Sequence, residues 1–316
     1  MPTPLLDNRQ LGPEVGQGRN NLLVNGGFEV WQRGNGPFGA GVYNADRWTA
    51  NIGTGASFSA SIARDQSANV DVNSNSCWTC TNYVGGSTPS VLDQAVEIGN
   101  RLRGSVVTFS VRVRTNVANH IRVALIDVDG TTIAYSNYHT GSNTYETLAV
   151  SLTCAANNPS GNLTCRVVFT VSSAVNLLDN AMLVVGSQRV DYVQMPMADE
   201  LARCERYYEV KGRSVGGGTP IAAGQATGPT STSHAFSYRA VKAITPTVTM
   251  AAAAAYAATN ASGSSVGFTA VSASAISSDG CQLNTSGAAA ASYTQGFASM
   301  LQNFTSSGSV IIEANP

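Results

Sequence analysis

The sequence predicts an all-β protein, with a jelly-roll sandwich followed by a short helix and a second, smaller β domain. The chain is rich in Gly, Ser, Thr, Asn, Val and Ala, and only 12% of its residues are charged. Apolar and polar residues alternate with a period of two in several short runs, which is the pattern of a pleated strand. Turn residues rather than helical periods separate these runs, so we expect an antiparallel sandwich.

The chain opens with a segment that has no strand pattern. Residues 1–20 contain three prolines, three glycines and no apolar period. Such a composition favours an extended arm that does not belong to a core. Arms of this kind often tie a subunit to its neighbours, and we expect residues 1–20 to anchor the chain.

Residues 21–195 are predicted to form the jelly roll. Within Val107–Val113 the apolar residues point to one side, and the polar residues between them point to the other, which indicates a half-buried strand. Alternation over Ile121–Leu125, the Asp129-Gly130 turn and Ile133–Tyr135 together indicate a hairpin. We expect further strands in three places along the chain: Leu148–Leu152, Val167–Val171 and Met182–Val185.

Helical spacing dominates only in residues 196–211, where Leu201, Cys204 and Tyr208 fall on one stripe. Asp199 is a suitable N-cap after Pro196, and we expect a short helix that links two domains. Residues 212–316 carry only a handful of charges and again contain strand-like pieces, so the second domain is predicted to be β. The run Ala251–Ala255 is predicted to continue a strand.

The scarcity of charge in residues 212–316 also predicts an oligomer. A domain with so few charges would be poorly solvated alone, so we expect it to pack against symmetry mates, with a trimer favoured. The formal net charge of the whole chain is -1, which offers no electrostatic footprint for nucleic acid or an acidic membrane surface. We expect no nucleic-acid partner, no membrane insertion and synthesis in the cytoplasm.

Cysteine and acidic motifs are the candidates for metal or disulfide sites. Cys77-Trp-Thr-Cys80 has the spacing of half a zinc site, but no second pair completes four ligands. Cys154 and Cys165 flank a predicted hairpin, and they are either bonded or reduced. Asp127-Val-Asp129-Gly130 has the start of a calcium loop without its downstream ligands, so we interpret it as a β-turn. No metal site or cofactor is therefore predicted.

Two segments resemble recurring phage virion sequences. Asn21–Gly34 followed by Tyr43–Trp48 is similar to the opening of phage tail-fibre proteins, and its core, Asn25-Gly-Gly-Phe-Glu29, resembles the first strand of jelly-roll carbohydrate-binding modules. Leu178–Ser187 through Glu200–Tyr208 resembles the closing strand of that module and the helix after it. Phe236–Lys242 and Pro246–Thr249 resemble, more loosely, the C-terminal domain of the same group.

The resemblance implies a phage virion structural protein, a subunit of an external fibre or spike assembled in the host cytoplasm. Its arm would contact other virion proteins, and the jelly roll would contact host surface polysaccharide. Modules of this resemblance often carry one structural calcium ion, for which the sequence shows no ligand set. A head or neck decoration fibre without ligand and a glycan depolymerase in the same appendage are the alternatives.

Aromatic residues are the candidates for glycan contact, because a ring offers a flat apolar face to a pyranose while polar neighbours fix its hydroxyls. Trp31 and Trp48 adjoin apolar strand residues and are predicted to fill the end of the sandwich. Trp78, Tyr83 and Tyr138 lie in polar stretches or near a turn, and we predict them as glycan-binding residues. Other aromatics available are Tyr43 and Tyr135.

No catalytic residues are predicted. Hydrolysis of a glycan needs two carboxylates at a defined separation, and the acidic residues of this chain are dispersed in sequence. Nucleophile elbows, zinc-protease motifs and phosphate-binding glycine loops are missing from the sequence, and its three histidines stand apart from one another. The sequence therefore predicts a chain that is not an enzyme.

Overall fold

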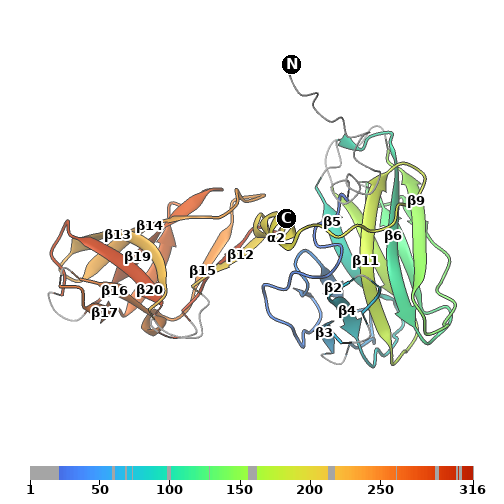
Figure 1. Ribbon diagram of the computed structural model, residues 1–316, viewed down its shortest axis with the longest axis horizontal. Helices are drawn as coiled ribbons and strands as arrows, with labels where there is room; N and C mark the ends of the chain where they lie inside the picture. The colour runs from blue at the N-terminus through green and yellow to red at the C-terminus, as the bar shows by residue number, and fades with distance from the viewer. Residues whose placement is uncertain are drawn as a thin grey trace, which may run out of the picture. The chain divides into compact units, whose positions relative to one another are not determined.

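The computed structural model describes most of the chain after residue 20: residues 21–58, 61–67, 70–72, 74–97, 101–127, 129–155, 162–212, 218–260, 262–288, 292–303, 305 and 308–315. The predicted arm, residues 1–20, lies outside the described residues. The chain folds into two compact units, which divide after Glu200 (Figure 1).

The first unit contains two antiparallel sheets that enclose a core. Along the six-stranded sheet the order is β1 (Val42–Tyr43), β2 (Thr49–Asn51), β5 (Ser90–Val96), β10 (Leu163–Phe169), β7 (Ile121–Ile126) and β8 (Ile133–Tyr135). Along the five-stranded sheet it is β3 (Ile62–Asp65), β4 (Cys77–Cys80), β11 (Asn176–Val185), β6 (Val106–Thr115) and β9 (Glu146–Thr153) (Figure 1). From β5 to β11 the chain crosses repeatedly between the sheets, as a jelly roll does.

The inward side chains of β6 are buried as predicted, but two of its outward side chains are buried as well. Val107, Phe109, Val111 and Val113 are fully buried between the sheets. Thr108 and Ser110, predicted to face solvent, are only 3% and 5% exposed. The Thr108 hydroxyl donates to the Gly186 carbonyl at 2.6 Å, so the segment after β11 folds over this face. Arg112 and Arg114, further along the same face, are partly exposed, so the half-buried prediction is wrong for Thr108 and Ser110 and holds for the second half of the strand.

The predicted hairpin is confirmed. Strands β7 and β8 pair with Ile126 opposite Ile133, and Gly130 in the turn has φ 70°, a value that suits glycine. The exposed Asp129 carboxylate accepts hydrogen bonds from the backbone N–H groups of Thr132 and Thr131, which lowers its pKa to about 2. Asp129 thus serves the turn.

The cysteines are thiols in this structure. All six are free and buried. Strand β9, which precedes Cys154, belongs to the five-stranded sheet, whereas β10, which contains Cys165, belongs to the six-stranded sheet. The predicted hairpin between them is therefore wrong. Among the described residues no group of three or more His, Cys, Asp or Glu could hold a metal ion.

Asn25 organises a turn in the segment predicted as the first strand. The residue has φ 58°, and its side-chain oxygen accepts the backbone N–H groups of Glu29 and Val30 at 2.9 Å each. Its amide group donates to the carbonyls of Val30 and Asp46 at 2.8 and 3.1 Å, and its own carbonyl accepts the Trp48 indole N–H at 3.0 Å. The motif thus forms a buried turn, and the strand prediction for it is wrong.

Tryptophans 31 and 48 lie in the core of the first unit, as predicted. Trp48 is 0% exposed and packs on Phe28 with a centroid separation of 4.9 Å. Trp31 is 7% exposed and donates its indole N–H to the Phe28 carbonyl. Both rings therefore fix the Asn25 turn against the sheets.

Helix α2 (Met197–Glu205) is shorter than the predicted helix, because Tyr208–Lys211 forms strand β12. In the second unit one sheet has the order β12, β21 (Val310–Glu313) and β15 (Thr247–Met250). The other has the order β17 (Ser265–Gly267), β16 (Tyr256–Thr259), β20 (Ala298–Asn303), β13 (Pro220–Gly228), β14 (Ser231–Ser237), β19 (Gly280–Ser286) and β18 (Ala270–Ser274). No helix in the described part of the chain is long and apolar enough to cross a membrane.

The alanine run before β16 differs from its prediction. Ala253–Ala255 forms the short 3-10 helix η3, and the strand begins only at Tyr256. The Tyr256 hydroxyl accepts the Ala251 N–H at 2.8 Å and donates to the Ser309 carbonyl at 2.6 Å. These two bonds turn the chain before the strand can start.

Replacing Asn25 by alanine should destabilise the first unit. The change leaves the buried N–H groups of Glu29 and Val30 without an acceptor, at a cost of about 1–3 kcal/mol for each. We expect the urea midpoint of the first unit to fall accordingly. Asn143→Ala is the matched control, since Asn143 has the same φ of 58° but is exposed. Equal losses in the two variants would show that backbone strain alone accounts for the effect.

Candidate functional site

Two of the three predicted glycan-binding residues lie in the core. Trp78 is 0% exposed and Tyr83 is 1% exposed. The Trp78 indole N–H donates to the Asn44 side-chain oxygen at 3.1 Å, and the Tyr83 hydroxyl donates to the Phe169 carbonyl at 3.1 Å. Because their polar ends are satisfied inside the protein, the polar sequence around them gave a wrong indication. Neither ring offers a face to a sugar.

The third predicted residue, Tyr138, is half-buried at the surface and belongs to a cluster of three side chains. The Arg122 guanidinium carbon lies 3.8 Å from the centroid of the Tyr135 ring and 4.9 Å from that of the Tyr138 ring. We call Arg122, Tyr135 and Tyr138 the Arg122 cluster. Contacts this short between a guanidinium and two rings are favourable cation–π interactions.

The hairpin register positions this cluster. On β7, Ile121, Val123 and Leu125 are fully buried, so Arg122 between them points to the outer side of the six-stranded sheet. On β8, Tyr135 lies opposite Ala124, the next outward position of β7. Arg122 and Tyr135 are therefore diagonal neighbours on one face, a separation that long and aromatic side chains can bridge.

Sequence reasoning missed Arg122 and did not select Tyr135, although the signal was available. The predicted hairpin places every second residue of both strands on the outer face, and Tyr135 was already counted among the available aromatics. Tyr135 is 46% exposed, and Ile133, two residues earlier on the same face, is 40% exposed. The exposed aromatic surface therefore lies on β8.

The Arg122 cluster combines an exposed tyrosine with a cation that has no acid partner among the described residues. Arg122 makes no ion pair or hydrogen bond with any residue of the described ranges, and its Nε is buried without a hydrogen-bond partner. On the neighbouring strand, Arg166 donates from Nε and one terminal nitrogen to the two oxygens of Asp93 at 2.8 and 2.7 Å. Arg122 thus lacks an acid partner in the described part of the chain, whereas the guanidinium of Arg166 is occupied by Asp93.

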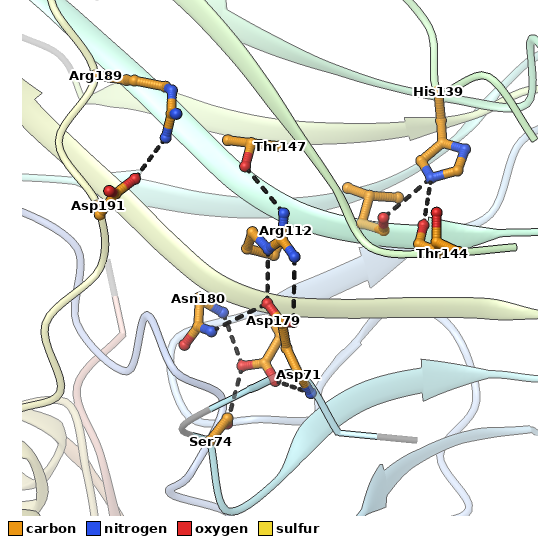
Figure 2. A network of polar contacts seen from close by, with 11 residues as sticks. Asp71, Ser74, Arg112, His139, Thr144, Thr147, Asp179, Asn180, Arg189 and Asp191 are labelled. Carbon is orange, nitrogen blue, oxygen red and sulfur yellow. Dashed lines mark hydrogen bonds and ion pairs between the residues drawn. The ribbon is translucent and has the colours of Figure 1, made fainter. Parts of the chain in front are cut away.

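A second polar group lies on the outer side of the five-stranded sheet (Figure 2). Arg112 Nε donates to Asp71 at 2.6 Å, and Asp179 accepts the Asp71 backbone N–H at 3.2 Å and the Ser74 hydroxyl at 3.1 Å. Asn180, at a bulge with φ 51°, donates to Asp71 at 3.4 Å. These contacts fasten the loop that carries Asp71 to β6 and β11.

The carboxyl group of Asp179 in this network has a raised pKa. Burial of the 0% exposed side chain raises its pKa to about 7, against the opposing effect of the hydrogen bonds from Asp71, Ser74 and Asn180. A raised pKa next to a second carboxylate is one mark of an acid–base pair. Here, however, Asp71 is held by Arg112, and Asp179 has no access to solvent.

An open groove lies on the second unit. It has a volume of about 680 Å³ and crosses β13, β14 and β19. Its lining residues are uncharged apart from Asp279, whose carboxylate accepts a hydrogen bond from the Ser277 hydroxyl at 2.5 Å. No exposed aromatic ring is among its lining residues, so the groove lacks the stacking surface that the Arg122 cluster has.

Comparison with protein-family models finds no match, and comparison with curated proteins finds none either. Solved structures that resemble part of this chain include an apo cyclase from Fischerella sp., which is 14% identical, with 52% of this chain and 95% of that chain covered and a TM-score of 0.37. The xylan-binding domain CBM22-1 of Xyn10C from Paenibacillus barcinonensis is 15% identical, with coverages of 54% and 96% and a TM-score of 0.34.

A phage protein is also among these structures. The enzymatically active domain of tailspike protein 4 from bacteriophage CBA120 is 11% identical, with 53% of this chain and 22% of that chain covered and a TM-score of 0.38. Similarity at these levels identifies no function for this chain.

The pH dependence of stability should reveal the buried Asp179. Because its folded-state pKa lies above the ordinary carboxyl value, its contribution to the free energy of unfolding is fully present below that value and is lost as the pH rises through about 7. We expect Asp179→Asn to reduce the loss of stability between about pH 5 and pH 8 by on the order of 2 kcal/mol. Urea unfolding across this range measures the effect.

The control for this prediction is Asp191→Asn. Asp191 is 86% exposed and pairs with Arg189 at the surface, so its removal should leave the pH profile of stability unchanged. If wild type and the Asp179 variant lost stability in parallel from pH 5 to pH 8, Asp179 would titrate as an ordinary carboxyl group.

Proposed function

We propose that the first unit binds a glycan at the Arg122 cluster. The observation that carries this proposal is the 46% exposed Tyr135 ring, held 3.8 Å from a guanidinium that has no hydrogen-bonding or ion-pair partner in the described chain. A sugar needs an apolar face for its C–H groups and donors for its oxygens, and the cluster presents both side by side. Ile133 extends the apolar part along the same strand.

The geometry also supports a preformed site. Tyr135 has few rotatable bonds, and its contact with Arg122 restricts the ring further. Tyr138 holds the other side of the cluster at 4.9 Å from the guanidinium carbon. A ligand that stacks on Tyr135 would therefore lose little free energy to ordering these side chains.

We further propose that the chain is a structural subunit of an external fibre or spike on a phage particle. The motifs Asn21–Gly34 and Leu178–Ser187 support this role by their resemblance to phage virion sequences. Antibody labelling of intact particles in electron micrographs would locate the chain, and its absence from purified particles would overturn this role. A head or neck decoration fibre is the alternative if the label lies on the head or neck.

We propose a binding role and no catalysis for this chain. In the Asp71–Asp179 pair, one carboxylate is neutralised by Arg112 and the other is fully buried. The alternative is an enzyme, a glycan depolymerase in the same appendage. Release of reducing ends from capsule or lipopolysaccharide by the purified chain would establish it.

The second unit supports the proposal of an oligomer. Residues 212–316 contain five charged residues, and Val241, Ile244, Phe297 and Met300 are 60%, 46%, 53% and 36% exposed. Large apolar side chains exposed on a domain with so few charges favour burial against another copy. We propose a homo-oligomer, with a trimer favoured.

Replacing Tyr135 by alanine should weaken glycan binding by roughly tenfold or more, which corresponds to about 1.4 kcal/mol. The reason is the loss of the stacking surface, and the measurement is affinity for the polysaccharides that the wild-type chain retains on a glycan array. Tyr43→Ala is the control, since it removes a half-buried ring under Arg33 from the opposite edge strand β1. Unchanged affinity in the Tyr135 variant would exclude the cluster as the binding site.

Light scattering coupled to size exclusion tests the oligomer. We expect the purified chain to elute with three times the mass of one chain, because the apolar side chains of the second unit are then buried. Substituting Phe297 by serine should shift the population towards the monomer. A monomer for the wild-type chain at micromolar concentrations would contradict the proposal.

A further inference from the structure

We propose that the ligand of the Arg122 cluster is an acidic glycan, whose anionic group pairs with the guanidinium of Arg122 while a sugar ring stacks on Tyr135. This inference rests on the proposed function and specifies its ligand. It predicts selectivity for charged over uncharged polysaccharides, which glycan binding by itself does not.

The charge of Arg122 has no counter-ion in the described part of the chain. Two other arginines of the first unit are paired with acids: Arg166, on the adjacent strand β10, forms a two-bond ion pair with Asp93, and Arg112, on the other sheet, pairs with Asp71 at 2.6 Å. Arg122 has only the two tyrosine rings as partners among the described residues. An aromatic ring attracts a cation through its quadrupole but carries no opposite net charge. The site therefore keeps a full positive charge at the sheet surface.

The hydrogen-bonding capacity of Arg122 points to the same ligand. Its Nε is buried and has no acceptor in the described chain, so a ligand would reach the two terminal nitrogens. These nitrogens form a planar fork, which matches the two oxygens of a carboxylate or phosphate. Hydrogen bonds to a charged acceptor are stronger than those to a neutral hydroxyl, so an anion gains most from this fork.

The local acid cannot take this role. Asp93, on β5, is separated from β7 by β10 in the sheet order, and both of its oxygens already accept from Arg166. Since Asp93 is occupied, an anionic ligand would meet Arg122 without displacing an existing ion pair. A neutral sugar would stack on Tyr135 equally well and would leave the charge of Arg122 unpaired.

A uronic acid and a phosphodiester-linked sugar share the chemistry that this site would recognise. The experiment therefore uses three groups of polymers on the full chain. Polygalacturonate, alginate and polysialic acid carry carboxylates, a sugar-phosphate teichoic acid carries phosphates, and the same carboxylated polymers reduced to alcohols are the uncharged counterparts. Affinity is measured by biolayer interferometry at low and high salt, because screening weakens an exposed ion pair.

Wild type should bind at least one acidic polymer roughly tenfold or more tightly than the uncharged polymers, as expected for a charge-assisted hydrogen bond. Arg122→Gln should lose this preference and bind acidic and uncharged polymers with affinities within about twofold of each other, given that a tenfold change is about 1.4 kcal/mol. Arg122→Lys should recover part of the preference, because it restores the charge without the planar fork. Arg189→Gln is the control with the same change in net charge, at an exposed ion pair with Asp191.

Each result separates the inference from the proposed function. If acidic and uncharged polymers bind equally and Tyr135→Ala weakens both, the glycan-binding function stands and the acidic ligand is excluded. If the acidic preference persists in Arg122→Gln, or is lost equally in Arg189→Gln, general attraction to charge replaces the site. If none of the polymers binds, the proposed function fails together with the inference. Circular dichroism of each variant confirms that the fold is retained.

Discussion

The entry of the chain into the first unit depends on the side chain of Asn25, which makes hydrogen bonds to four backbone groups. Asn25 adopts a left-handed conformation, and its amide satisfies two N–H groups and two carbonyl groups of a buried turn. The Asn25 carbonyl accepts the Trp48 indole N–H, and the Asn25 backbone N–H donates to the Glu200 carboxylate at 2.5 Å. Because buried backbone groups must be paired, this turn lets the chain enter the sandwich without a strand at that point. The aromatic core then packs against it.

Alternation predicted the strands well, and the reason is physical. One face of each strand must be apolar to form the core, so β6, β9 and the β7–β8 hairpin could be predicted from period two alone. Strand β11 is buried along most of its length, and only its last residues, Met182–Val185, were predicted. The covered outer face of β6 could not be predicted, because the covering loops come from distant parts of the sequence. Asp71 approaches Asp179 across 108 residues, a contact that strand periodicity does not encode.

At the candidate site, too, a contact within one hairpin could be predicted from the sequence, whereas contacts between distant segments could not. Trp78 and Tyr83 have polar neighbours in sequence, yet acceptors from distant segments, Asn44 and Phe169, bind their polar ends in the core. Tyr135 and Arg122, in contrast, are brought together by one hairpin whose register follows from its turn. A site made by a hairpin can be predicted from sequence when outward positions are compared across the turn, whereas burial of an aromatic ring depends on the whole sandwich.

The outer faces of the sandwich hold both paired and unpaired charges, and Arg166 with Asp93 is a pair on the six-stranded sheet. On the five-stranded sheet, Arg112 and Asp71 pair with each other, and loops bury Asp179. On the six-stranded sheet, the outward surface of β7 and β8 keeps an exposed ring and an arginine without a counter-ion among the described residues. Paired charges under a loop serve the fold, because removing one leaves the other buried. Arg122, with no acid partner in the described chain, is held between two rings by cation–π attraction, which leaves its net charge uncompensated. This geometry supports the proposal of a ligand that brings the missing anion.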